Sequence, residues 1–198
     1  MAMTTEAPTA PVTNELTYED YMAEPTVYGR YDIVNGVRIL MPGATWDHNE
    51  ITLNLGELLR GFTRASKIGK ANIAPFDVLI QRFPKMQVRQ PDLLFISHAR
   101  LTQTGGRPAK GPLEIGPELV VEIVSNSETQ RILSDKIADY ITIGVDECWV
   151  VRPDAGTVEV LTLTPDGAQS VAVYGEGQKV QSVIFAGLTV SVADIFAA

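Results

Sequence analysis

Cysteine is almost missing from this chain, and Cys148 is the only one among 198 residues. A disulfide within one chain is therefore excluded. Cys148 lies in the apolar run Glu147-Cys-Trp-Val-Val, so we expect a small core residue rather than a nucleophile. The sequence also lacks a Cys/His zinc spacing, a Walker loop and a Gly-x-Ser-x-Gly elbow. Structural zinc, ATP use and serine-hydrolase chemistry therefore have no support.

Long hydrophobic runs are missing as well. No apolar stretch approaches the roughly 20 residues that span a bilayer, although 45% of the residues are hydrophobic. Residues 1–14 are rich in Thr, Pro and Ala and contain no hydrophobic signal core. We therefore expect a disordered tail over residues 1–14 and one domain over residues 15–198. We also expect a cytoplasmic protein that does not bind a membrane.

The chain has no excess of positive charge, since its formal net charge is -8. This balance argues against indiscriminate binding to nucleic acids. The charge is unevenly distributed, however. Residues 60–110 contain ten Lys or Arg residues and two acids, Asp77 and Asp92. This interval is either a surface that faces a polyanion or a set of solvated loops of mixed sign.

The hydrophobic pattern predicts alternating helices and strands. Helices are expected at 17–21 with Thr17 as the N-cap, at 46–64, and at 128–143 with Ser127 as the cap. Asn35-Gly36 between two apolar runs predicts a hairpin over 31–40. Further strands are expected at 70–74, 78–82, 92–96, 119–124, 148–151, 158–163 and 170–174, with a short closing segment at 190–196. Residues 97–116 have the composition of a long surface loop.

Lys136 lies on the apolar side of the predicted helix over 128–143. At about 100° per residue it shares that half of the helix with Leu133, Ile137 and Tyr140. Burying an unpaired ammonium group is very costly, so the side chain must either extend outward to water or meet an anion.

Two acids pose the opposite problem. Glu122 lies in the run Glu118-Leu-Val-Val-Glu-Ile-Val, which is typical of a strand covered on both faces. Asp92 follows Pro91 at the start of another apolar strand. Each carboxylate needs a cation, and the two acids can meet Lys136 at one edge of the sheet. This grouping suggests a metal-dependent site. Two alternatives stay open. Taken singly, Asp92 also fits the role of a turn or cap residue, and Glu122 with Lys136 also fits a purely structural ion pair.

Taken in order, these motifs resemble the Uma-type restriction endonucleases of the PD-(D/E)XK nuclease superfamily, over roughly residues 16–163. The residues that carry the resemblance are Tyr31-Asp-Ile-Val-Asn-Gly, His48, Arg89-Gln-Pro-Asp92, Pro117-Glu-Leu-Val-Val-Glu122-Ile-Val-Ser125, Lys136 with Tyr140, and Gly144-Val-Asp-Glu-Cys-Trp149. The resemblance implies an α/β fold with a restriction-endonuclease-like mixed β-sheet core flanked by helices. The predicted hairpin over 158–174 would extend that sheet as a C-terminal β-hairpin.

The resemblance also implies a site and a reaction. Asp92, Glu122 and the backbone carbonyl of Ile123 would hold Mg²⁺, with Mn²⁺ as the alternative ion. The expected substrate is DNA, whose phosphodiester bonds an endonuclease hydrolyses with a metal-activated water. Lys136 would orient that water or stabilise the developing charge. His48 is either a catalytic residue near the phosphate or a hydrogen-bonded core histidine. A homodimer is expected because duplex DNA presents two strands.

Two departures from the family pattern matter. The superfamily lysine usually lies two residues after the second acid, where this chain has Val124, so Lys136 is the expected substitute. Asp32 stands where the Uma pattern usually has Glu, which limits it to an outer role through water. These departures keep open a catalytically inactive nucleic-acid-binding or scaffold protein with the nuclease fold. A hydrolase acting on a small phosphate ester is a third alternative.

Overall fold

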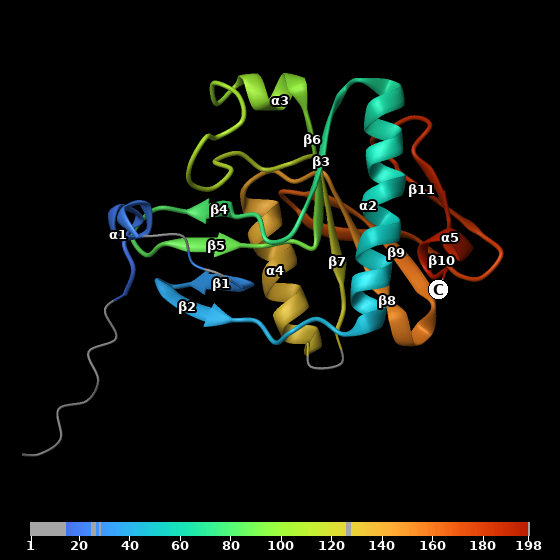
Figure 1. Cartoon of the computed structure of the whole chain (residues 1–198), viewed down its shortest axis with the longest axis horizontal. Helices are drawn as coiled ribbons and strands as arrows, with labels where there is room; N and C mark the ends of the chain where they lie inside the picture. Colours follow the sequence, from blue (N-terminus) through green and yellow to red (C-terminus); the bar gives the residue numbers. More distant parts are fainter. Residues whose placement is uncertain (1–14, 25–26, 28, 126–127, 198) are drawn as a thin grey trace, which may run out of the picture.

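A computed structural model describes residues 15–24, 27, 29–125 and 128–197 of the chain. The predicted tail over 1–14 lies outside these described residues, as does Ser127. The described part contains a six-stranded sheet, a four-stranded sheet and a two-stranded sheet (Figure 1). Within this part, no helix is long and apolar enough to cross a membrane.

The six-stranded sheet forms the centre of the molecule. Its order is β10-β9-β8-β7-β6-β3, with β7 and β8 parallel and the other neighbours antiparallel. The strands are β3 (Gly69–Ile73), β6 (Leu93–Ser97), β7 (Leu119–Ile123), β8 (Glu147–Arg152), β9 (Thr157–Thr164) and β10 (Gly167–Tyr174). A mixed sheet with β9 and β10 added as a C-terminal hairpin is the predicted architecture, and the prediction is confirmed.

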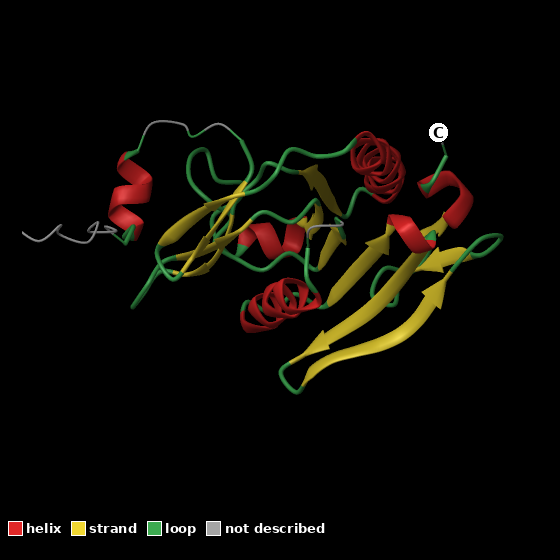
Figure 2. Ribbon diagram, turned by 90° about the horizontal axis from the view of Figure 1, so that it is seen from below, coloured by secondary structure: helices red, strands yellow, loops and turns green. Residues whose placement is uncertain are grey.

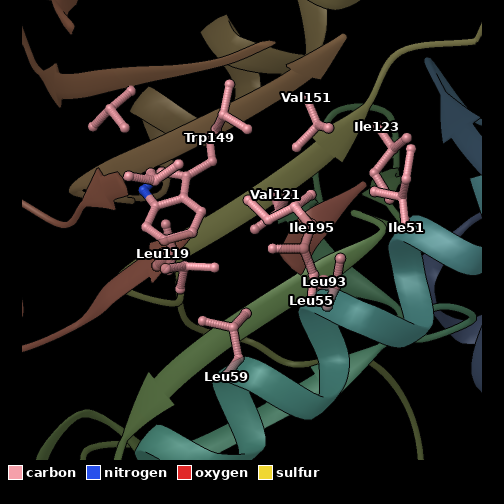
Figure 3. Packing of buried hydrophobic residues seen from close by; sticks show 14 of the residues in the cluster. Ile51, Leu55, Leu59, Leu93, Leu119, Val121, Ile123, Trp149, Val151 and Ile195 are labelled. Atoms are coloured by element: carbon pink, nitrogen blue, oxygen red, sulfur yellow. The ribbon is translucent and has the colours of Figure 1, made fainter. Parts of the chain in front are cut away.

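Helices cover both faces of this sheet (Figure 2). The helix α2 (Trp46–Ser66) packs Ile51, Leu55 and Leu59 against apolar side chains of β6, β7 and β8 (Figure 3). The helix α4 (Gln130–Thr142) packs Leu133 and Tyr140 on the opposite face. Both faces of β7 are therefore buried, which explains the continuous apolar run in its sequence.

A second sheet stands beside the first and has the order β2-β1-β5-β4. Its strands are β1 (Tyr31–Val34), β2 (Val37–Leu40), β4 (Val78–Gln81) and β5 (Gln87–Arg89). The predicted hairpin joins β1 and β2, with Asn35 and Gly36 both at positive φ. The short helix α1 (Tyr18–Ala23) precedes this sheet, and Thr17 and Asp20 form its capping box.

Several local predictions differ from the structure, and β11 (Lys179–Gln181) is a strand that was not expected. The strand β5 was not expected, because three residues are too few to show a period. The expected loop over 97–116 begins with the helix α3 (His98–Thr102), which Ser97 caps and whose Leu101 is buried. The helix α4 begins later than predicted, since its N-cap is Thr129, whose side chain accepts a hydrogen bond from the Ile132 N–H.

The C-terminal segment packs on the α2 face of the sheet. It consists of β11 (Lys179–Gln181), β12 (Thr189–Ser191) and the helix α5 (Val192–Ile195). The 3₁₀ turn η1 (Pro153–Ala155) lies earlier in the chain. Val180, Val190 and Ile195 join the same core as α2. Cys148 is fully buried on the other face, as expected of a core residue, and burial raises the pKa of its thiol.

Glu147 joins this segment to the sheet. Its carboxylate is fully buried and accepts hydrogen bonds from the Trp149 indole, the Ser182 hydroxyl and the backbone N–H groups of Val183 and Ile184. A buried carboxylate that satisfies several donors in this way stabilises the fold, because each donor would otherwise be unpaired.

We expect Glu147→Gln to lower the free energy of unfolding by about 3 kcal/mol, because an amide can no longer accept all of these hydrogen bonds. Urea denaturation followed by circular dichroism measures the change. The matched control is Glu176→Gln, at an exposed position, which should change the stability by less than about 0.5 kcal/mol. Equal stability of the two variants would contradict the assignment.

Candidate active site

Asp92 and Glu122 lie at the same end of the central sheet. Asp92 directly precedes β6, and Glu122 lies in the neighbouring strand β7. The antiparallel register of β6 and β7 pairs Leu93 with Val121, so the next pair outward is Asp92 and Glu122. Both carboxylates are almost fully buried. The two carboxylates repel each other, so the negative charge of Asp92 acts to raise the pKa of Glu122. The two acids predicted from the sequence are therefore brought together.

Glu122 is held from the α4 side of the sheet. Lys136 Nζ lies 2.8 Å from its Oε2, and the Tyr140 hydroxyl donates to its Oε1. Burial raises the pKa of Glu122 to about 7, although Lys136 and Tyr140 act in the opposite direction and Asp92 adds to the rise. Burial therefore favours the protonated form of Glu122, and a further cation beside it would favour the ionised form.

Lys136 meets two anions in the interior, which resolves the problem posed by its place on the apolar side of the helix. Besides Glu122, its Nζ lies 2.9 Å from Glu128 Oε1. Burial alone lowers the pKa of Lys136, but the charges of Glu122 and Glu128 more than offset it and the pKa is raised. The ammonium group is therefore positively charged and fixed in position beside Glu122.

Asp92 is held from the α2 side and by the neighbouring sheet. His48 Nε2 lies 3.1 Å from Asp92 Oδ1, and the Arg30 guanidinium donates to the same oxygen. The Ile123 N–H donates to Asp92 Oδ2 at 2.7 Å. Burial acts to raise the pKa of Asp92, but His48, Arg30 and the Ile123 N–H outweigh it and the pKa is lowered. Asp92 is therefore ionised at neutral pH.

Asp32 contacts residues of β5 and the segment that follows it. Its two carboxylate oxygens accept hydrogen bonds from the Arg89 guanidinium at 2.8 Å and from the Gln90 N–H at 3.1 Å. Arg89 also donates to Asp139 of α4 at 2.7 Å. This chain of contacts fixes β1 and β5 against α4. Asp32 therefore supports the position of the strand that leads to Asp92.

Several residues of the site were not singled out from the sequence. Arg30 has no pattern of its own, because it precedes β1 and reaches Asp92 only through the tertiary fold. Glu128 precedes the N-cap of α4, and its carboxylate lies against Lys136. Tyr140 was recognised as part of the motif, but the contact of its hydroxyl with Glu122 was not foreseen. The one available signal was the need for a second polar partner for a buried carboxylate.

The donor set is suited to an oxygen-preferring divalent ion. Asp92 and Glu122 repel each other, and an ion between them would favour the ionised form of Glu122. Within the residues that the structure describes, no group of three or more His, Cys, Asp or Glu side chains is arranged for a metal. Two carboxylates suit Mg²⁺, which usually keeps several water ligands. They do not suit a structural zinc site.

Comparison with known proteins identifies the family. Residues 18–193 match the model of the Uma2 family, described as "Putative restriction endonuclease". The chain belongs to the Uma2 family. A search of curated proteins found no match. Membership of Uma2 supports a nuclease function, as the resemblance in the sequence implied.

A solved structure has the same fold. It is described as a "putative nuclease belonging to DUF820 from Anabaena variabilis ATCC 29413", and it is 20% identical in sequence with a TM-score of 0.72. The similarity covers 91% of this chain and 97% of the other. At this identity the comparison supports the fold of this Uma2 protein and says nothing about the roles of its residues.

Proposed function

We propose that this Uma2 protein is a Mg²⁺-dependent DNA endonuclease. Asp92 and Glu122 form the site at which it hydrolyses phosphodiester bonds. The observation that carries the proposal is the juxtaposition of these two carboxylates, from adjacent strands, with the buried ammonium group of Lys136. Asp92 and Glu122 would hold the ion together with the backbone carbonyl of Ile123. Mn²⁺ is the alternative ion, because it accepts the same oxygen ligands.

When bound, the divalent ion supplies Lewis-acid activation of the phosphodiester and a water of lowered pKa. The protein's own groups then position the reactants. Glu122 is fixed by Lys136 and Tyr140, so its free lone pairs point in a defined direction. Lys136 remains charged and stabilises negative charge that develops on the phosphate oxygens.

His48 from α2 and Arg30 from the start of β1 complete the Asp92 side of the site. Both contact Asp92 Oδ1 and place positive or hydrogen-bonding groups beside the proposed phosphate position. His48 lies in the first turn of α2, where its side chain is only 12% exposed and reaches Asp92. We assign it a role in holding Asp92 and the phosphate. The proton of the attacking water is released to solvent or to a phosphate oxygen.

The substrate and assembly follow from the chemistry of DNA. The two strands of a duplex are antiparallel, so two copies related by a twofold axis would place one site at each strand. A homodimer on duplex DNA is therefore part of this proposal. Sedimentation of the protein with and without a short duplex measures the number of chains in the complex.

A second candidate is a catalytically inactive protein that retains the nuclease fold and binds nucleic acid. The observation that favours it is that the carboxylate oxygens of Asp92 and Glu122 all accept hydrogen bonds from protein groups. In this interpretation Lys136 and Glu122 form only a structural ion pair. Val124, in the usual lysine position of the superfamily, is consistent with it.

Nicking of supercoiled plasmid separates the two candidates. The endonuclease should convert the plasmid to the nicked or linear form with Mg²⁺ or Mn²⁺, and EDTA should stop the reaction. A protein that shifts the plasmid in a gel but leaves it intact with either ion would favour the inactive candidate. A small phosphate ester in excess should not compete with the plasmid, which distinguishes an esterase.

A further inference from the structure

The basic residues between positions 60 and 110 fall into two groups in the structure. Four of them form ion pairs, and a fifth, Lys110, donates a hydrogen bond to a backbone carbonyl. Arg82 pairs with Glu114, Lys85 with Glu15, Arg89 with Asp32 and Asp139, and Arg100 with Glu118 and Asp146, while Lys110 donates to the Met22 carbonyl. The four ion-paired residues therefore contribute little to a surface that attracts a polyanion.

The other five have no such partner. Within the described residues, no ion pair or side-chain hydrogen bond is formed by Arg60, Arg64, Lys67, Lys70 or Arg107, and all five are exposed. This contrasts with Arg30, Arg38 and Arg152, which pair with acids. Unpaired guanidinium and ammonium groups at a surface remain available to an anionic partner.

These five cations gather around the edge strand β3. Arg60 and Arg64 lie one turn apart on α2 and line a groove of about 550 Å³ between α2 and β3. Lys70 and Arg107 line a second, smaller hollow that shares Ala71 and Asn72 of β3 with the first. Lys67 lies at the C-cap of α2, in the turn that leads to β3. Positive charge therefore lies along both sides of one strand.

The groove is open because small side chains line it. Gly56 of α2 and Ala71 of β3 both line it, and a Cβ added at Gly56 would lie 3.4 Å from the Ile73 side chain. Thr52, Asn54 and Asn72 add polar groups, and Glu57 is the one acid in the lining. The lining therefore combines two guanidinium groups with neutral donors, which is suited to a phosphate backbone.

The groove is continuous with the candidate active site. Ile73, at the end of β3, pairs with Leu93, and the next residue, Ala74, donates its N–H to the Asp92 carbonyl. On the α2 side, the Thr52 hydroxyl donates to the His48 carbonyl one turn earlier. From Thr52 to Arg64 the helix rises about 18 Å, which corresponds to about five phosphate groups of a duplex strand. Both walls of the groove thus lead outward from Asp92.

We infer that the α2–β3 groove holds the phosphate backbone of the nucleic-acid substrate on one side of the bond that is cut. Arg60 and Arg64 contact phosphates from α2, and Lys70 and Arg107 contact them from the opposite side of β3. This inference rests on the proposed function and assigns a specific surface to substrate binding. It explains how a protein with a net charge of -8 attracts a polyanion, because its unpaired cations are concentrated beside the site.

The salt dependence of binding tests this inference. Binding of a fluorescein-labelled oligonucleotide is measured by fluorescence anisotropy, in EDTA to prevent cleavage. The NaCl concentration is varied about tenfold, from roughly 50 to roughly 500 mM. The variants are Arg60→Gln with Arg64→Gln, and Lys70→Gln with Arg107→Gln. The matched control is Arg131→Gln with Lys179→Gln, at exposed positions on α4 and β11. Circular dichroism confirms that each variant is folded.

Each groove variant should reduce the slope of log affinity against log salt by about 1.8 with duplex DNA or about 1.4 with a single strand, because two phosphate contacts are lost. With duplex, the affinity ratio of wild type to variant should then change about 60-fold across that salt range. The control should keep the wild-type slope.

Two results would overturn the inference. Wild-type slopes in both groove variants, in a protein that still cleaves DNA with Mg²⁺, would reject the groove and leave the nuclease proposal intact. No binding to duplex or single strand by the wild-type protein would reject the inference and the proposed function together. An equal loss of slope in the control would show a general effect of net charge and would also reject the groove.

Discussion

Replacing Asp92 with Asn should reduce Mg²⁺-dependent nicking of plasmid DNA by about a thousandfold. Asp92 is the proposed ligand that stays ionised, since His48, Arg30 and the Ile123 N–H lower its pKa despite burial. A bound ion is worth several kcal/mol of transition-state stabilisation, and each 1.36 kcal/mol corresponds to a tenfold change in rate. The neutral amide keeps the size of the side chain and loses the negative charge that holds the ion.

The control for this variant is Asp135→Asn. Asp135 lies on α4 with its side chain 63% exposed, and its nearest cation is Arg131 at 4.0 Å. It should nick plasmid at the wild-type rate. If Asp92→Asn retained nicking within tenfold of the wild type while remaining folded, Asp92 would not be a metal ligand and another site would have to be sought.

Removing Lys136 should have two separate effects, on stability and on cleavage. In Lys136→Met the carboxylates of Glu122 and Glu128 lose their shared buried partner. Breaking a buried ion pair on one side typically costs about 3–5 kcal/mol, although protonation of Glu122, whose pKa is about 7, relieves part of this cost. Cleavage should fall by at least about a hundredfold, because the fixed positive charge beside the phosphate is lost.

The double variant Lys136→Met with Glu122→Gln separates these effects. Since it removes both charges of the pair, it should regain much of the stability in urea denaturation. It should still fail to nick plasmid, because the second carboxylate is also gone. A double variant with restored stability and near wild-type cleavage would show that the pair is purely structural. Lys136→Arg, which keeps the charge, should be more stable than Lys136→Met.

Much of the fold followed from local patterns in the sequence. The hairpin at Asn35-Gly36, the apolar stripe of α2 and the continuous apolar run of β7 each predict one element with a definite partner. The contacts between elements are less local. The strand β5 is too short to show a period, and α3 depends on a single cap at Ser97. The assignment of residues 15–198 to one domain stays a prediction.

The candidate site shows the same division. Asp92, Glu122 and Lys136 were identified because a charged group inside an apolar pattern needs a partner, and the structure places all three at one end of the sheet. That argument gives no partner from a different part of the chain. Arg30 reaches Asp92 from the start of β1. Arg89 donates hydrogen bonds both to Asp32 of β1 and to Asp139 of α4. Only the tertiary fold determines those contacts.

The charge distribution also required the structure. From the sequence, ten basic residues between 60 and 110 could be a surface for a polyanion or solvated loops of mixed sign. Internal ion pairs account for Arg82, Lys85, Arg89 and Arg100. The unpaired cations Arg60, Arg64, Lys67, Lys70 and Arg107 lie around β3. That they face a polyanion stays a prediction, which the salt dependence of binding tests.

Binding of Mn²⁺ in the absence of DNA tests the central claim most directly, because it does not depend on catalysis. Titration followed by electron paramagnetic resonance counts the ions bound and gives their affinity. We expect one ion per chain in the wild type and in Asp135→Asn, and at least about tenfold weaker binding in Asp92→Asn and in Glu122→Gln. Wild-type affinity in both of these variants would contradict a metal site formed by Asp92 and Glu122.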